Sequence, residues 1–209
     1  MGRYTGPACR LCRREGMKLF LKGIRCSMAK CAIETGSPAP GMHGLTRRKK
    51  VSEYGVQLRE KQRLRRQFGL QEGQFRVVFG RALRTRGVTG EKMLQLLETR
   101  LDNVVFRLGF ASSRRAARQL VTHSHVMVNG RRANIPSMVV GEGAVVAVKT
   151  RAKSRDLVMR NLEGAEGRIV PPWLTLDLEK LSGQVQRMPT REEIAPIVNE
   201  QLIVELYSK

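Results

Sequence analysis

Residues 112–130, SSRRAARQLVTHSHVMVNG, carry the strongest structural signals in the middle of this chain. Either leading serine can cap a helix from Arg114 to about His123, because a serine hydroxyl accepts a hydrogen bond from the first turn of a helix. The Asn129-Gly130 pair follows alternating valines and predicts a strand entering a type I′ hairpin turn, since both residues tolerate positive φ. We therefore expect a short helix followed directly by a β-hairpin.

The expected helix has two chemically different faces. Each residue turns a helix by about 100°, so the alanines, Leu120 and Val121 share one side and the arginines gather on the other. We predict that the apolar side packs on a core and that the basic side, with the arginines after the turn, binds RNA by its backbone and shape. The arginines concerned are Arg114, Arg115, Arg118, Arg131 and Arg132.

Charge limits the partners that this chain can have. Its 209 residues include 39 Lys and Arg against 18 Asp and Glu, a formal net charge of +21. Residues 1–155 hold 33 basic and 9 acidic side chains, a net of +24, whereas residues 156–209 hold 6 and 9, a net of −3. We expect a polyanion to meet the first three quarters and the tail to face protein. Nucleic acid is the leading partner, and an anionic membrane is the alternative.

Composition and motifs argue against several other classes of protein. With 41% hydrophobic residues the chain can bury a core without cross-links. No stretch approaches the run of about 20 apolar residues that a membrane-spanning helix needs, and the N-terminus MGRYTGPACR lacks the apolar core of a signal peptide. There is no Gly-rich phosphate loop, nucleophile motif or pair of catalytic acids. We expect a folded protein that is not an enzyme, has no small-molecule substrate and stays in the compartment where it is made.

All four cysteines lie near the N-terminus. Cys9 and Cys12 form a C-x2-C pair, and after thirteen intervening residues Cys26 and Cys31 form a C-x4-C pair. Two close pairs separated by a loop suit tetrahedral zinc, and four thiolates would close its coordination shell, so the metal would be structural. A four-cysteine iron–sulfur cluster is the alternative, and reduced thiols or disulfides also stay open. We expect a zinc knuckle, by which we mean residues 1–45 folded around these thiols.

Three helices are expected in the next sixty residues. A helix over 52–69 has a narrow apolar stripe and many arginines, so it is expected to lie against phosphates. A helix ending at Gly87 and a long one over 89–109 have apolar stripes typical of core helices. The basic residues expected to bind RNA here are Arg47, Arg48, Lys49, Lys50, Arg59, Lys61, Arg63, Arg65 and Arg66.

The last quarter of the chain is expected to contain both helices and strands. Ser154 can cap another helix, residues 173–188 alternate as in a hairpin, and Trp173 is expected to be packed rather than stacked on a base. Thr190 and Glu193 form a capping-box pattern before a final amphipathic helix.

Two histidines stand between the expected helix and hairpin. His123 and His125 have no carboxylates close by in sequence, so RNA contact or support of the hairpin is favoured over metal binding.

Several stretches together resemble one family. ETRLDNVVFRLGFASSRRAARQLVTHSHVMVNGRR, residues 98–132, closely resembles the helix-helix-hairpin RNA-binding motif of the small-subunit ribosomal protein S-four family. The resemblance continues in MGRYTGPACRLCRREG at the start and in PPWLTLDL and NEQLIVELYSK towards the end, so it covers essentially the whole chain. Ser124 is a departure, because the family usually has glycine between the two histidines. Serine at that position argues against a positive φ.

The resemblance implies an α+β fold. It consists of an N-terminal metal knuckle and a helical domain, with an inserted helix-hairpin RNA-binding domain. The expected segments are the knuckle and extended loop (1–45), the helical RNA-binding domain (46–98), the helix-hairpin domain with its β-rich part (99–190), and a C-terminal helix that returns to the helical domain (191–209).

The resemblance also implies a function. A member of this family is a structural constituent of the small ribosomal subunit, a primary binder of its ribosomal RNA at a helix junction of the 5′ domain, and nucleates subunit assembly. It would contact neighbouring small-subunit proteins and messenger RNA near the entry path, and contribute to translational accuracy. The location would be the cytoplasm, or an organellar ribosome. An RNA-modifying enzyme and a zinc-ribbon protein that binds duplex DNA are the competing interpretations.

The RNA-binding residues that match the motif by position can be named. Those in the helix-helix-hairpin motif are Arg100, Arg107, Arg114, Arg115, Arg118, Asn129, Arg131 and Arg132, with His123 beside them. Outside that motif, RNA binding is also expected of Arg3, Arg10, Arg13 and Arg14, of which the last three stand beside the cysteines in sequence. Phosphate contact is the expected role, and base recognition is left open.

Overall fold

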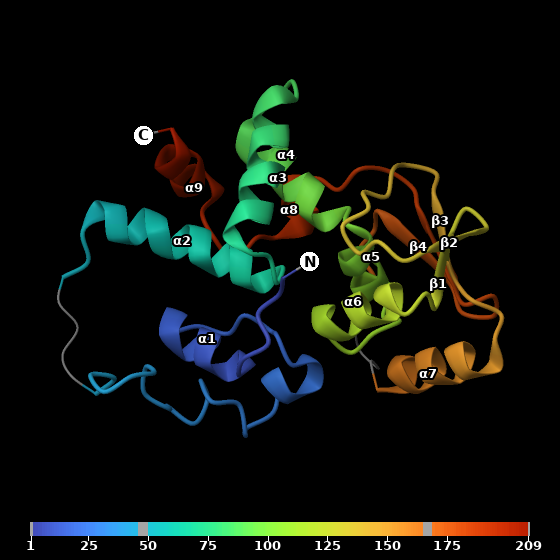
Figure 1. Cartoon of the computed structure of the whole chain (residues 1–209), viewed down its shortest axis with the longest axis horizontal. Coiled ribbons are helices and arrows are strands. Elements are labelled where there is room, and N and C mark those ends of the chain that lie inside the picture. The colour runs from blue at the N-terminus through green and yellow to red at the C-terminus, as the bar shows by residue number, and fades with distance from the viewer. Residues whose placement is uncertain (1, 46–49, 165–168, 209) are drawn as a thin grey trace. The chain divides into compact units, whose positions relative to one another are not determined.

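The computed structural model describes residues 2–45, 50–164 and 169–208. The chain forms two compact units (Figure 1). Unit 1 comprises Met1–Met93 and Pro196–Lys209, and unit 2 comprises Leu94–Ala195. The C-terminal segment therefore belongs to the same unit as the N-terminal one, and unit 2 is inserted between them in the sequence.

Unit 1 is helical. The serine cap expected before its longest helix is confirmed, because the Ser52 hydroxyl accepts a hydrogen bond from the Gly55 amide at 3.3 Å. That helix is followed by Gly69 at φ +66°. The elements are α1 (Ala8–Glu15), the 3-10 helix η1 (Gly23–Cys26), α2 (Glu53–Gln67), α3 (Glu72–Arg84), the start of α4 (Thr89–Glu98) and α9 (Glu200–Tyr207).

Helix α2 is more deeply packed than its narrow apolar stripe predicts. Helix α9 lies along it, with Gln57 donating to Glu205 at 3.1 Å and the Asn199 amide donating to Glu60 at 3.0 Å. Lys61 is buried and donates to Glu72 at 2.7 Å. Polar side chains therefore form much of this helix contact, which explains why an apolar pattern does not reveal it.

Unit 2 contains a five-stranded antiparallel sheet in the order β2-β1-β3-β5-β4. The expected hairpin is confirmed: Asn129 and Gly130 join its strands with φ of +49° and +77°. The strands are β1 (Val126–Val128), β2 (Arg131–Ala133), β3 (Val145–Val148), β4 (Leu174–Asp177) and β5 (Ser182–Val185).

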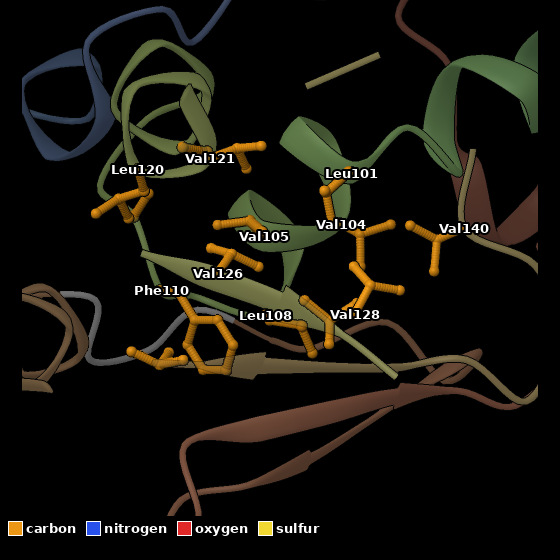
Figure 2. Packing of buried hydrophobic residues seen from close by; sticks show 14 of the residues in the cluster. Leu101, Val104, Val105, Leu108, Phe110, Leu120, Val121, Val126, Val128 and Val140 are labelled. Carbon is orange, nitrogen blue, oxygen red and sulfur yellow. The ribbon is translucent and has the colours of Figure 1, made fainter. Parts of the chain in front are cut away.

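Helices α5 (Leu101–Arg107) and α6 (Arg114–Thr122) share one hydrophobic core with the sheet. Figure 2 shows Val104 and Val105 of α5 and Val121 of α6 directed towards Val126 and Val128 of β1. Trp173 belongs to the same core and is 1% exposed, as expected for a packed tryptophan. The remaining helices of unit 2 are α7 (Ala152–Glu163) and α8 (Arg191–Ile194).

The prediction of a single long helix over 89–109 is wrong. Helix α4 ends at Glu98, and Arg100 is extended with ψ 137° before α5 begins. The amide of Leu101 donates to Met138 O, and the amide of Val140 donates to Thr99 O, both at 2.8 Å. Backbone bonds to a distant loop thus replace the helical bonds at the break.

Two smaller expectations also fail. Ser124 has φ +61°, so serine occupies the left-handed conformation that its chemistry argued against, and its amide donates to Val121 O at 2.8 Å. Ser154 does not cap α7: Arg151 precedes the first turn, and Ser154 lies buried inside the helix against His125.

The observed architecture is a mixture of helices and antiparallel sheet, which confirms the α+β class. None of the helices in the described part of the chain combines the length and apolar character that a membrane span requires.

Candidate nucleic-acid interface

The first arginine cluster of unit 2 forms around Glu98, whose side chain is 2% exposed. Arg107 donates to both carboxylate oxygens, at 2.8 and 3.0 Å, and the Asn103 amide donates to one of them at 2.6 Å. Arg114 donates to Asn103 Oδ1 at 2.7 Å, and its guanidinium carbon lies 4.6 Å from the centre of the Phe106 ring. We call these residues the Glu98 cluster, in which α4 supplies the acid and α5 and α6 supply the arginines.

A second cluster forms around Asp102 at the start of α5. Arg100 donates to its two oxygens, both at 3.2 Å, and Arg118 of α6 donates at 3.1 Å. We call these three residues the Asp102 cluster. The side chain of Arg100 is 6% exposed, whereas that of Arg118 is 13% exposed and that of Arg107 in the other cluster is 26% exposed. Arg100 is therefore enclosed by protein, while the other two keep solvent-facing surface.

The buried acid of the Glu98 cluster is ionised by its partners. Burial works to raise the pKa of Glu98, but the charges of Arg107 and Arg114 and the hydrogen bonds from Arg107 and Asn103 outweigh it and hold the pKa below its usual value. Burial likewise works to lower the pKa of Arg107, and Glu98 outweighs it and raises that pKa. The pair thus stays charged in the folded protein.

The hairpin adds a second basic surface in unit 2. Arg131 and Arg132 of β2 are exposed. The Asn129 side chain accepts a hydrogen bond from the Val145 amide at 2.8 Å, so this side chain fixes the turn to β3. Arg115 of α6 is partly buried. Sequence reasoning placed all four in one motif, and the structure gives Asn129 a contact that stabilises the hairpin.

The two histidines differ in their surroundings. His123 is exposed, while His125 Nδ1 lies 2.9 Å from Ser154 Oγ and thus connects the hairpin to α7. Burial, helped by the positive charges of His123, Lys149 and Arg151, lowers the pKa of His125. A neutral His125 that supports the hairpin agrees with the packing role expected for it.

Unit 1 also contains a buried acid surrounded by arginines. The side chain of Glu15, at the end of α1, is fully buried and meets Arg59, Arg63 and Arg66 of α2. Arg59 lies 3.3 Å and Arg63 3.8 Å from its oxygens. Burial lowers the pKa of Arg66, and Glu15 opposes this shift.

A cavity of about 550 Å³ opens beside these residues. Its wall includes Arg59, Arg63 and the exposed Arg14, together with Met42 and His43 from the loop before α2. The cavity is therefore bordered by both guanidinium groups and apolar surface.

The other expected RNA-binding residues lie in varied surroundings. Arg3, Arg10 and Lys50 are exposed, and Arg13 donates to Pro38 O at 3.0 Å. Arg65 donates two hydrogen bonds to Gln62 Oε1, at 2.6 and 3.0 Å. The run of Arg47, Arg48 and Lys49 falls outside the described residues.

The four cysteines are unbridged thiols of unit 1. Cys12, Cys26 and Cys31 are buried and Cys9 is half-buried. Burial raises the pKa of Cys12, and the other three cysteines add to this, while a backbone hydrogen bond at Leu19 opposes it. Within residues 2–45, 50–164 and 169–208, no group of three or more His, Cys, Asp or Glu side chains has the arrangement of metal ligands.

Comparisons with known proteins agree with this geometry. The family described as "Ribosomal protein S4/S9 N-terminal domain" matches residues 3–98, and the "S4 domain" family matches residues 99–146. A Thermus thermophilus protein named "Small ribosomal subunit protein uS4" is 55% identical over 209 residues, the whole of both chains. The chain belongs to the uS4 family. Relatives with the same name in Acetivibrio thermocellus and Natranaerobius thermophilus are 57% and 59% identical, again over the full length of both proteins.

Sequence reasoning missed the acids of the uS4 motif. Glu98, Asp102 and Asn103 contact its arginines, although the pattern of basic residues does not indicate them. Their sequence does carry a clue, because two acids stand within five residues in a strongly basic half of the chain.

Proposed function

We propose that this chain is a structural constituent of the small ribosomal subunit that binds the ribosomal RNA of that subunit. The observation that carries the proposal is the full-length identity of 55–59% to proteins named for the small subunit. The arginine clusters and the basic hairpin supply the chemistry, because guanidinium groups held on a rigid scaffold suit RNA phosphates. As in those relatives, the role is structural and not enzymatic.

The finer function follows the resemblance. The chain is proposed to bind a helix junction of the 5′ domain early in assembly, to contact neighbouring small-subunit proteins and messenger RNA near the entry path, and to contribute to translational accuracy. It would act in the cytoplasm, where the small subunit works. The phosphate-binding residues of this proposal are the exposed and partly exposed arginines of both units, with Arg107, Arg118 and Arg131 as examples.

Competition binding tests this function. The native protein is given a 5′-domain fragment of small-subunit ribosomal RNA, an unrelated structured RNA of equal length and a DNA duplex, at several salt concentrations. We expect a preference for the ribosomal fragment that persists at high salt, because oriented contacts are lost less readily than diffuse charge attraction. Equal and steeply salt-dependent binding to all three would refute the proposal.

We also propose that Cys9, Cys12, Cys26 and Cys31 hold a zinc ion. The donor set fits chemically: four unbridged thiols come from two short segments, three of them are buried, and the Lys22 amide donates to Cys26 Sγ at 3.3 Å. Zinc would supply a cross-link between α1 and η1, and a four-cysteine iron–sulfur cluster is the alternative.

Metal analysis tests the zinc site. The protein purified without chelator is expected to contain about one zinc per chain, and Cys26→Ser is expected to lose most of it. A visible absorbance with iron would favour the cluster. Four thiols that react fully with a thiol reagent, in protein without metal, would refute both.

A further inference from the structure

The proposed RNA-binding surface of unit 2 contains two carboxylates, which is unexpected beside a polyanion. Two carboxylates, Glu98 and Asp102, meet four guanidinium groups, so the two clusters keep an excess of positive charge. A surface that attracts a polyanion through charge alone gains nothing from acids, because each one cancels part of the attraction. The placement of these acids therefore needs a reason other than net charge.

The geometry supplies that reason. The carboxylate of Glu98 accepts two parallel bonds from Arg107, an arrangement that fixes the plane of the guanidinium group. These bonds use two of the five N–H donors of Arg107, and its side chain keeps solvent-facing surface. Asp102 similarly accepts one bond from Arg118, which also stays partly exposed.

Each acid is itself held in place from within the protein. Asn103 donates to Glu98 at 2.6 Å and accepts from Arg114 at 2.7 Å, so it joins the acid of α4 to the arginine of α6. Arg100, enclosed by protein, donates twice to Asp102. The acids therefore form the inner layer of the two clusters, and Arg107, Arg114 and Arg118 form the outer one.

We propose that Glu98 and Asp102 are positioning residues for RNA binding, which hold Arg107, Arg114 and Arg118 in the orientation in which they meet phosphates. The inference rests on the proposed RNA-binding function and assigns Arg100 to positioning as well. Fixing an arginine before binding removes the entropy loss that a mobile side chain would suffer on contact. The acids thus favour the RNA whose phosphates match the fixed arginines.

The test uses the sign of the charge change. Glu98→Gln and Asp102→Asn each raise the net charge by one, so simple attraction predicts tighter binding to any RNA. Positioning predicts the opposite for the 5′-domain fragment: a loss of about tenfold, the scale of one charge-assisted hydrogen bond. It also predicts a shallower salt dependence, by about 0.7 to 0.9 in log-log slope for each lost phosphate contact. Binding to the unrelated RNA should be unchanged or stronger.

Glu179→Gln is the matched control. Glu179 lies exposed between β4 and β5, so the variant gains the same charge without touching either cluster. It should bind both RNAs as the native protein does, or slightly more tightly. If the two cluster variants behave like this control, in affinity and in slope, the positioning role is overturned.

Folding is checked separately through the fluorescence of Trp173, which lies in the core of unit 2. Binding is measured only at temperatures where each variant is folded. Should Glu98→Gln unfold, Asp102→Asn carries the same prediction, and unfolding of both at every temperature would assign the acids to the fold alone and overturn the inference. A native protein that does not prefer the fragment would refute the proposed function itself, whereas a normal preference in native and variants refutes only the positioning role.

Discussion

Gly183 in β5 offers a stringent test of the packing in unit 2. A Cβ atom built on this glycine would lie 2.7 Å from Leu108 Cδ1 and 2.9 Å from the carbonyl oxygen of Thr175, and closer still to Leu108 Cδ2. Leu108 is completely buried, and the Thr175 oxygen belongs to the backbone of the paired strand β4. Neither neighbour can move away easily, so Gly183→Ala should overpack the core.

The expected magnitude comes from two opposed effects. Alanine is favoured over glycine inside a strand by roughly 0.5–1 kcal/mol, so local preference alone predicts a more stable protein. Overpacking of a closed core costs about 1–3 kcal/mol. We therefore expect the free energy of unfolding to fall by about 1 kcal/mol, the difference between the mid-range values of the two effects.

A double-mutant cycle isolates the contact. Leu108→Ala alone should cost about 2–5 kcal/mol because it leaves a cavity. In the double variant the clashing methyl groups are gone and the new alanine fills part of that cavity, so the combined loss should be smaller than the sum by about 1–2 kcal/mol.

Trp173 provides the assay for this cycle. It is the only tryptophan in the chain and lies in the same core as Leu108, so its fluorescence during denaturation by urea reports the unfolding of unit 2. A Gly183→Ala variant as stable as the native protein, or strictly additive losses in the cycle, would show that this packing is described wrongly.

The same assay tests two further sites, and RNA binding tests a third. Ser124→Gly should raise the free energy of unfolding by about 1 kcal/mol by relieving the left-handed backbone, whereas Ser124→Ala should give no such gain. Because the pKa of His125 is below its usual 6.5, the neutral form is favoured on folding: stability should be full above pH 6.5 and fall as pH decreases through the folded pKa. His125→Gln should remove this part of the pH dependence between pH 7.5 and 5.5, and an unchanged profile would assign it to other groups. Replacing the exposed Arg131 and Arg132 with alanine should reduce the salt slope of RNA binding by about 0.7 to 0.9 per lost contact with little change in stability, and an unchanged slope would remove the hairpin from the interface.

The sequence predicts best where a few adjacent residues determine the structure. Asn129 and Gly130 specify their turn by their own tolerance of positive φ, and Ser52 caps α2 through an amide three residues away. The break between α4 and α5 could not be predicted in this way, because its backbone bonds go to Met138 and Val140, about forty residues further along the chain. Local periodicity favours a continuous helix there, and only the folded loop overrides it.

The contacts between arginines and acids could not be predicted from the sequence either. The sequence identifies Arg107 and Arg118 as basic residues of the motif, but their acid partners stand nine and sixteen residues away and meet them only after α5 and α6 have folded together. A count of charges treats every arginine as equally available. The structure instead separates Arg100, enclosed by protein, from the exposed Arg131 of the hairpin.

Both units contain a buried glutamate that contacts several arginines, although different helices supply these residues. In unit 1 the buried Glu15 meets three arginines of α2, and in unit 2 the buried Glu98 meets Arg107 and Arg114 from α5 and α6. Each acid lowers the local charge and so weakens long-range attraction, which salt screens in any case. Each also fixes guanidinium groups at defined positions, and such short-range contacts depend on the shape of the RNA. A chain of net charge +21 has attraction in excess, so it can lose a little of it to acids that orient its arginines, and oriented arginines favour the RNA whose phosphates match them.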